Sequence, residues 1–199
     1  RMRLAVLRGA WHEAEGLFME MRGMITTGRD YYLLHTADMC RGAMYGYLGL
    51  LEDMPEWLRR DDGGQSRLYL FAGGHYYLLH GRALLLSGEN AKTVALFDSL
   101  LSDKNLSRHR LFEIHACIYI AVAYHRLGNE PAARAALRQA LKTALPDRVY
   151  MPFVENSDLL GPLLHAETWL NDDDRLAGLE RITELATCWR ASMDSIRRE

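Results

Sequence analysis

The eight histidines of this 199-residue chain are its most obvious candidates for chemistry. His75 and His80 stand five residues apart, a spacing that occurs between the histidine ligands of some zinc fingers. No Cys-x-x-Cys pair accompanies them, and the chain has no His-Glu-x-x-His motif. We therefore expect no bound metal, and we expect most of the histidines to serve in packing or on the surface.

Motifs for catalysis are equally sparse. The sequence has no glycine-rich phosphate loop and no Gly-x-Ser-x-Gly elbow. The carboxylates of Asn171-Asp-Asp-Asp174 stand at an expected helix start, where capping and the helix dipole explain them. The Asp61-Asp-Gly-Gly64 turn lacks the alternating oxygen ligands of a calcium loop. The sequence thus predicts a protein that is not an enzyme and that holds no cofactor in this segment.

Four glycines mark the elements that would position any functional side chain. Gly9, Gly49, Gly88 and Gly128 are spaced 40, 39 and 40 residues apart, and repeats of this length are typical of stacked helix pairs. A large apolar residue stands nine positions after each glycine: Phe18, Leu58, Phe97 and Leu137. Small residues stand seven positions before the last three: Gly42, Gly81 and Ala121. We infer helix hairpins in which the glycine ends the first helix.

This register predicts the helices directly. The expected pairs cover residues 1–8 and 10–26, 31–48 and 50–60, 67–87 and 89–103, and 108–127 and 130–145. Asn129 can cap the last of these, and Pro146 and Pro152 then end the repeat. Two further helices follow, and no strand pattern is comparably strong. We predict an all-α, right-handed superhelix over 1–145, closed by C-terminal helices over 146–199.

The order small, Tyr or Leu, Gly, Ala or Thr, Phe or Leu is similar to the tetratricopeptide (TPR) pattern, with a longer period. After it come Tyr150-Met-Pro-Phe153, a short loop and a Leu-Leu pair within residues 137–164. In these features the chain resembles the repeat domain of MalT-type, LuxR-family ATP-dependent transcriptional regulators. The resemblance implies an ATP-binding domain before this segment and a DNA-binding helix-turn-helix after it. It also implies that an inducer, together with ATP, favours self-association and DNA binding.

The repeat geometry also predicts a groove. In TPR-like stacks the first helix of each hairpin faces the concave side, so positions 13, 6 and 3 before each glycine should point there. The candidate groove residues are His75, Arg82, His115 and His125, flanked by Tyr47 and Arg126. Polar groups and rings that converge on a groove suit a small polar ligand or a peptide. The alternative is that they are ordinary solvated helix residues.

Composition limits the partners. The net charge is −2, and the 24 basic and 26 acidic residues are interspersed without a basic stripe, so we expect no DNA contacts in this segment. The resemblance implies that the parent protein contacts DNA through another domain. No apolar run is long enough to span a membrane. Three widely separated cysteines suit reduced thiols in a cytoplasm. The chain begins in mid-pattern at Arg1 and reads as a piece of a longer protein.

Two functions fit these observations. The first is a non-enzymatic module for effector sensing and self-association in a bacterial LuxR-type regulator. The alternative is a generic TPR adaptor that docks a partner protein. A carboxylate-clamp adaptor, which grips a peptide C-terminus, is disfavoured because the positions ten before the glycines hold Met39, Leu78 and Ile118.

Overall fold

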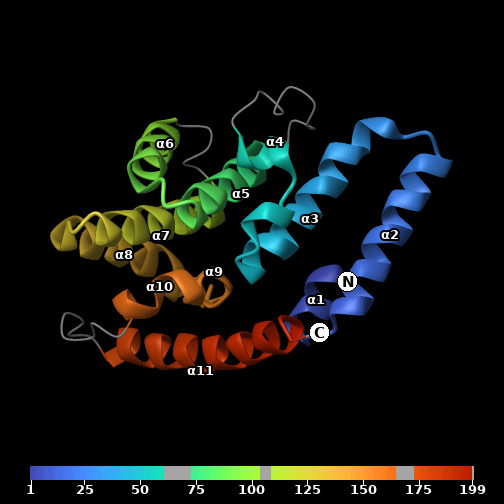
Figure 1. Cartoon of the computed structure of the whole chain (residues 1–199). Helices are drawn as coiled ribbons and strands as arrows, with labels where there is room; N and C mark the ends of the chain where they lie inside the picture. Colours follow the sequence, from blue (N-terminus) through green and yellow to red (C-terminus); the bar gives the residue numbers. More distant parts are fainter. Residues whose placement is uncertain (61–72, 104–108, 165–172, 199) are drawn as a thin grey trace. The chain divides into compact units, whose positions relative to one another are not determined.

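The computed structural model describes residues 1–60, 73–103, 109–164 and 173–198 (Figure 1). All regular secondary structure in these ranges is helical, so the chain is all-α as predicted. It divides into two units: unit 1 is Arg1–Leu86 with Ala191–Glu199, and unit 2 is Ser87–Arg190. This division differs from the predicted boundary after residue 145. The predicted turn at 61–66, the Ser107 cap and the start of the final helix at Asn171 lie outside the described residues.

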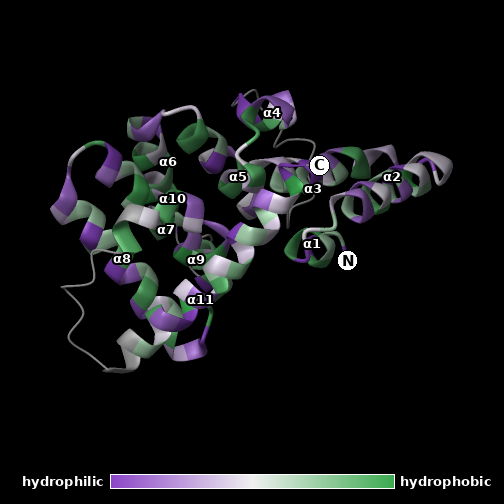
Figure 2. Ribbon diagram, turned by 60° about the horizontal axis from the view of Figure 1, so that its bottom comes forward, coloured by the Kyte–Doolittle hydropathy of each residue, from purple (hydrophilic) through white to green (hydrophobic). Residues whose placement is uncertain are grey.

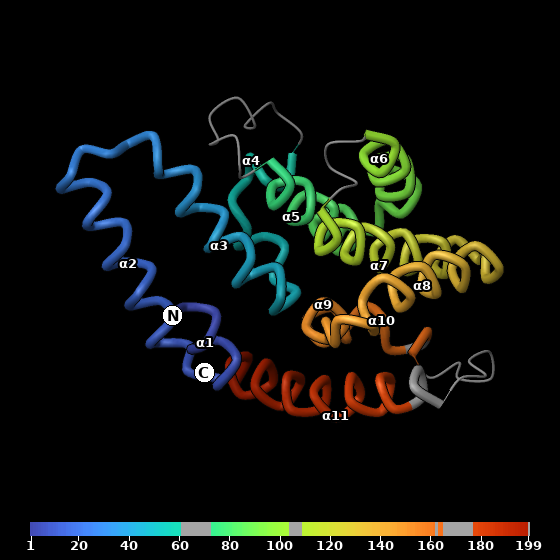
Figure 3. The backbone as a smooth tube through the Cα atoms, turned by 180° about the vertical axis from the view of Figure 1, so that it is seen from behind, coloured from blue at the N-terminus to red at the C-terminus, as the bar shows by residue number. Residues whose placement is uncertain are grey.

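Unit 1 contains the first two hairpins and the first helix of the third. Its elements are α1 (Met2–Leu7), α2 (Trp11–Thr27), the 3-10 helix η1 (Tyr31–Leu33), α3 (Leu34–Leu48), the 3-10 helix η2 (Leu51–Asp53), α4 (Glu56–Arg59) and α5 (Gly73–Leu86). Helix α2 packs against α1 and α3, and α5 packs against α3 and α4 (Figure 3). Most helices of unit 1 therefore pack against a helix that is near them in the chain.

Unit 2 is built around α7. Its elements are α6 (Asn90–Ser102), α7 (Arg110–Arg126), α8 (Glu130–Ala144), the 3-10 helix η5 (Leu145–Asp147), α9 (Met151–Glu155), α10 (Ser157–Leu164) and α11 (Asp173–Ile196), whose last part belongs to unit 1. Helix α7 packs against α6, α8, α9 and α10. As a result every residue from Ile114 to Ala123 is buried.

The four repeat glycines adopt the left-handed conformation, with φ of 72°, 74°, 79° and 77° in chain order. Three of the turns close in the same way, with the amide after the glycine donating to the carbonyl five residues back. These bonds are Ala10 to Ala5 at 2.9 Å, Leu50 to Tyr45 at 3.0 Å and Asn129 to Tyr124 at 2.9 Å. This is the Schellman pattern of helix termination, and glycine adopts its left-handed position without the steric cost of a Cβ. The prediction that these glycines end helices is confirmed.

The second helix of each hairpin is less regular. Asn129 caps α8 by accepting a hydrogen bond from the Ala132 amide at 3.3 Å, as predicted. The expected helix over 50–60 instead divides into η2 and α4. The break falls at Met54, whose extended backbone (φ −67°, ψ 141°) is the conformation that Pro55 favours in the residue before it.

The helices pack through amphipathic faces, and Figure 2 shows apolar and polar residues alternating along them. In unit 1 the small-residue prediction is met at Gly42, where an added Cβ would clash with the Leu58 side chain of α4. The last helix also has a buried apolar face, formed by Ile182, Ala186, Trp189, Met193 and Ile196.

The end of α11 is anchored within unit 1. Ser192 Oγ donates to the carbonyl oxygen of Leu7 at 2.9 Å, at the end of α1. Arg197 donates from Nε and Nη2 to the carbonyl oxygen of Leu48 at 3.2 and 3.1 Å, at the end of α3. A basic residue at a helix C-terminus satisfies carbonyls that have no partner within the helix. Arg197 thus joins the C-terminal end of α11 to the end of α3.

Within the described ranges, every helix falls short of the length or the apolar character that a bilayer span requires.

Candidate functional site

The predicted groove residues of unit 1 take different positions. Arg82 on α5 is only 1% exposed, with its guanidinium 5.3 Å from the centre of the Tyr47 ring and its Nε donating to the Gly46 carbonyl at 2.6 Å. A Cβ added at Gly46 would stand 3.4 Å from Arg82 Cδ, an ordinary contact distance, so Arg82 lies directly against α3. His75 lies near the start of the same helix and is exposed. The structure therefore brings Arg82 and Tyr47 together as a buried contact between α3 and α5.

In unit 2 the buried candidate is His115 on α7, which is 8% exposed. Asn156 Nδ2 donates to His115 Nδ1 at 3.3 Å and to the Pro152 carbonyl at 2.7 Å. Nδ1 can accept only in the tautomer that carries its proton on Nε2, so this bond selects that neutral form. His115 thus contacts the α9–α10 segment and does not face an open groove.

The two remaining candidates lie at the end of α7. His125 Nδ1 is 2.5 Å from Glu130 Oε1, a contact across the Gly128 turn between two half-exposed side chains. Arg126 is exposed. His115 and His125 are ten residues apart on one helix, roughly 15 Å along its axis, so no small ligand spans both. The binding role of these residues stays a prediction, but they do not form one cluster within unit 2.

Polar residues that the sequence analysis did not select lie buried at the junction of α9 and α10. Glu155, Asn156 and Ser157 are 1%, 0% and 4% exposed. Buried polar groups need hydrogen-bond partners, and the Asn156 bonds to α7 and to α9 are an example. The sequence signal was present, because four consecutive polar residues, Glu155 to Asp158, interrupt the apolar run between Phe153 and Leu159.

The three cysteines are free thiols. Burial raises the pKa of Cys40, and burial followed by the charges of Glu113 and Asp98 raises the pKa of Cys117 to about 12. Both are therefore poor nucleophiles near neutral pH, since the thiolate is the reactive form. Among the described residues, no three His, Cys, Asp or Glu side chains converge in a way that could hold a metal ion.

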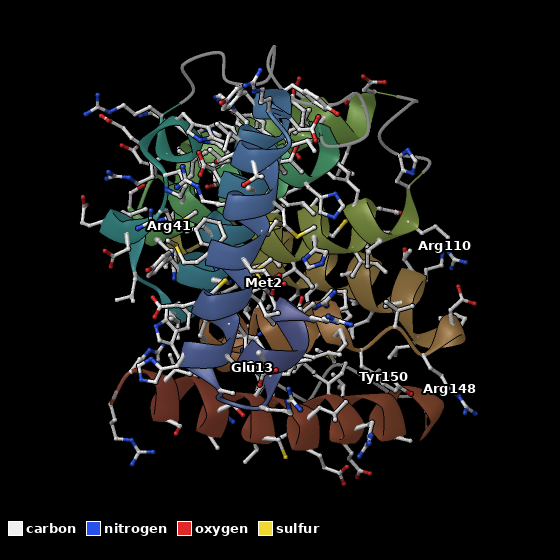
Figure 4. All side chains as sticks on the ribbon, turned by 90° about the vertical axis from the view of Figure 1, so that its right-hand side faces the viewer. Met2, Glu13, Arg41, Arg110, Arg148 and Tyr150 are labelled. Carbon is white, nitrogen blue, oxygen red and sulfur yellow. The ribbon has the colours of Figure 1, made fainter. Side chains whose placement is uncertain are left out.

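A surface hollow between α2 and α3 in unit 1 was not predicted. It has a volume of about 290 Å³ and is lined by Glu15, Phe18, Met19 and Arg22 of α2 and by Arg41, Met44 and Tyr45 of α3. Arg22 and Arg41 lie over aromatic rings, 5.9 Å from the centre of Phe18 and 5.3 Å from the centre of Tyr45. Figure 4 shows Arg41 beside α2. We call this the α2–α3 hollow.

Helical spacing explains how the hollow forms. Glu15, Phe18, Met19 and Arg22 recur at intervals of three and four, so they share one face of α2. Arg41 and Tyr45 are four apart on α3, and the same spacing places the guanidinium over the ring. The sequence alone does not show that these two faces meet, because that depends on how α2 packs against α3.

The lining of the hollow suits binding more than catalysis. Two guanidinium groups supply hydrogen-bond donors in a fixed planar arrangement, and the Met and aromatic side chains supply apolar surface. Glu15 is the only carboxylate among the lining residues. Comparison of the chain with protein-family models, curated proteins and solved structures finds no match.

Proposed function

We propose that the chain is a non-enzymatic module for effector sensing and self-association in a cytoplasmic LuxR-type transcriptional regulator. The observation that carries this proposal is the fourfold register of left-handed glycines at a period of 39–40 residues. Together with the family resemblance of residues 137–164, this register supports a TPR-like superhelix of hairpins. ATP and DNA would bind elsewhere in the parent protein.

Such a module would sense its effector through a shift in the populations of its conformations. A repeat array has large surfaces between neighbouring hairpins, and a ligand that binds one arrangement better stabilises that arrangement. The effector and the self-association surface are then coupled, so each raises affinity for the other. This mechanism requires binding and no bond-making step.

The test is made on the purified chain, without any further domain. The purified protein is expected to lack ATPase activity and to show no affinity for duplex DNA. A thermal-shift screen against sugars, metabolites and aromatic compounds should find at least one small molecule that raises the melting temperature, because a ligand that binds only the folded state stabilises it. Tight, salt-sensitive DNA binding by this chain would contradict the proposal.

A second candidate, a TPR adaptor for a partner protein, is favoured by a separate observation. Unit 1 exposes several large apolar side chains, with Met19 and Met24 at 65% and 69% and Tyr31 and Tyr32 at 56% and 55%. Exposed apolar residues that gather on a surface are typical of docking sites. The adaptor predicts that protein partners, and no small molecule, raise the melting temperature in the same assay.

A further inference from the structure

We propose that the α2–α3 hollow binds a small carboxylate that carries one aromatic ring. The carboxylate would lie between Arg22 and Arg41, and the ring would lie on the apolar lining formed by Met19, Met44 and Tyr45.

The charge of the hollow argues for an anion. Arg22 and Arg41 are both half-buried, and neither forms an ion pair within the part of the chain that the structure describes. With Glu15, the lining carries two positive charges and one negative charge. A guanidinium that is partly removed from water gains most from a carboxylate, which it can bind through two parallel hydrogen bonds. The hollow therefore favours a ligand with a single negative charge.

The two arginines are also preorganised. Each lies over a ring of its own helix, Arg22 over Phe18 and Arg41 over Tyr45. A cation held over an aromatic face has lost much of its rotamer freedom before a ligand arrives. Less conformational entropy is then lost on binding, so even a small anion can be held.

The rest of the lining argues for an apolar body of limited size. Phe18, Met19, Met44 and Tyr45 present hydrocarbon, sulfur and ring surface, and methionine adapts its shape to an aromatic ligand. The volume of about 290 Å³ is near the lower end for small-molecule sites. A molecule with one ring and one carboxylate fits this volume, whereas a folded peptide does not.

The proposal that the hollow binds a carboxylate rests only on the geometry of unit 1. Only the further step, that the carboxylate is the effector of a regulator, rests on the proposed function. The binding experiment below does not use DNA or ATP, so its outcome is independent of the tests given above for the regulator.

Phenylacetate is a suitable probe, and isothermal titration calorimetry on the whole chain measures its affinity. We expect a Kd of about 1 mM or tighter, given the size of the ligand. Phenylacetamide, which has the same shape without the charge, and sulfate, which has charge without a ring, are each expected to bind about 10-fold more weakly. Arg22→Gln/Arg41→Gln should abolish measurable binding, and Arg134→Gln, at an exposed position on α8, should leave it unchanged.

Met19→Glu gives a second variant that keeps both arginines. Met19 is 65% exposed, so the substitution leaves the core intact and adds a competing carboxylate at the hollow. It should weaken phenylacetate binding about 10-fold while the helical signal in circular dichroism stays the same. Equal affinity for phenylacetamide, or unchanged binding in either variant, would overturn the proposal. Tighter binding of an acidic peptide than of phenylacetate would replace the small carboxylate with a protein partner.

Discussion

A matched pair of glycine substitutions tests the repeat that organises this fold. Gly49 ends α3 in the left-handed conformation, with φ of +74°, and Gly23 lies inside α2. Both are exposed, and a Cβ added at either position would meet nothing within 4 Å. Alanine at the two positions therefore differs only in the backbone conformation that it must adopt.

The two substitutions should have opposite effects on the free energy of unfolding. At Gly49 the left-handed conformation costs an L-residue roughly 1–2 kcal/mol. A smaller gain of roughly 0.4–1 kcal/mol, from a less flexible unfolded chain, offsets part of this cost. At Gly23 alanine replaces glycine in a helix interior and should stabilise by about 0.5–1 kcal/mol. The difference between the two variants should be close to 2 kcal/mol.

Urea denaturation followed by circular dichroism at 222 nm measures both variants, and thermal melts should separate them by roughly 4–8 °C. Gly49→Asn provides a control, because asparagine tolerates the left-handed region better than alanine. It should destabilise less than Gly49→Ala. If Gly49→Ala stabilises the chain as much as Gly23→Ala does, then Gly49 is not left-handed and the glycine register does not mark helix ends.

Four further predictions concern the buried polar groups and the thiols. Arg82→Met should lower the free energy of unfolding by about 1–3 kcal/mol, because the buried Gly46 carbonyl loses its charged donor and keeps only the Gly49 amide. Arg60→Met, at an exposed ion pair, should change it by less than about 0.5 kcal/mol in the same urea titration. Asn156→Leu should lower the free energy of unfolding by about 1–3 kcal/mol in that titration, because two buried hydrogen bonds are lost. In the folded protein at pH 8, iodoacetamide should modify Cys188, which is exposed, and spare Cys117, which mass spectrometry of tryptic peptides can check. Because the pKa of Cys117 is raised in the folded protein, the thiol of the unfolded chain loses its proton at a lower pH than the folded thiol does. The contribution of Cys117 to the free energy of unfolding is therefore present below pH 9 and is lost as the pH rises from 9 to about 12.

Local signals in the sequence were enough to predict most of the helices. The conformation of a helix-ending glycine and of the helix start that follows it depends only on residues nearby in the chain. At Gly128, for example, the glycine is left-handed and Asn129 caps α8 as expected. In the stretch 50–60 a short helix with Pro55 near its start was expected, and α4 does begin after Pro55; residues 51–53 form the separate η2 because Pro55 favours extended backbone at Met54. Both outcomes follow from interactions among residues close in sequence.

The candidate site could be predicted much less well. Arg22 and Arg41 are far apart in the chain, and each alone resembles an ordinary surface cation. Their shared hollow arises from the packing of α2 against α3, which no short-range pattern encodes. Arg82 was selected for a groove, yet it is buried, with its guanidinium over the Tyr47 ring and its Nε bonded to the Gly46 carbonyl. Contacts of this kind depend on tertiary structure.

The burial of His115 shows that a register taken from a repeat family does not determine which side chains of a helix stay exposed. The rule that the first helix of a hairpin lines a groove holds only while nothing further packs against that helix. In unit 2 the segment after the last hairpin forms α9 and α10, and both pack on α7. Asn156 from this segment then binds His115. A site on such a helix must therefore be sought where later chain does not return, and in unit 1 the α2–α3 hollow, between two helices of adjacent hairpins, meets that condition among the described residues.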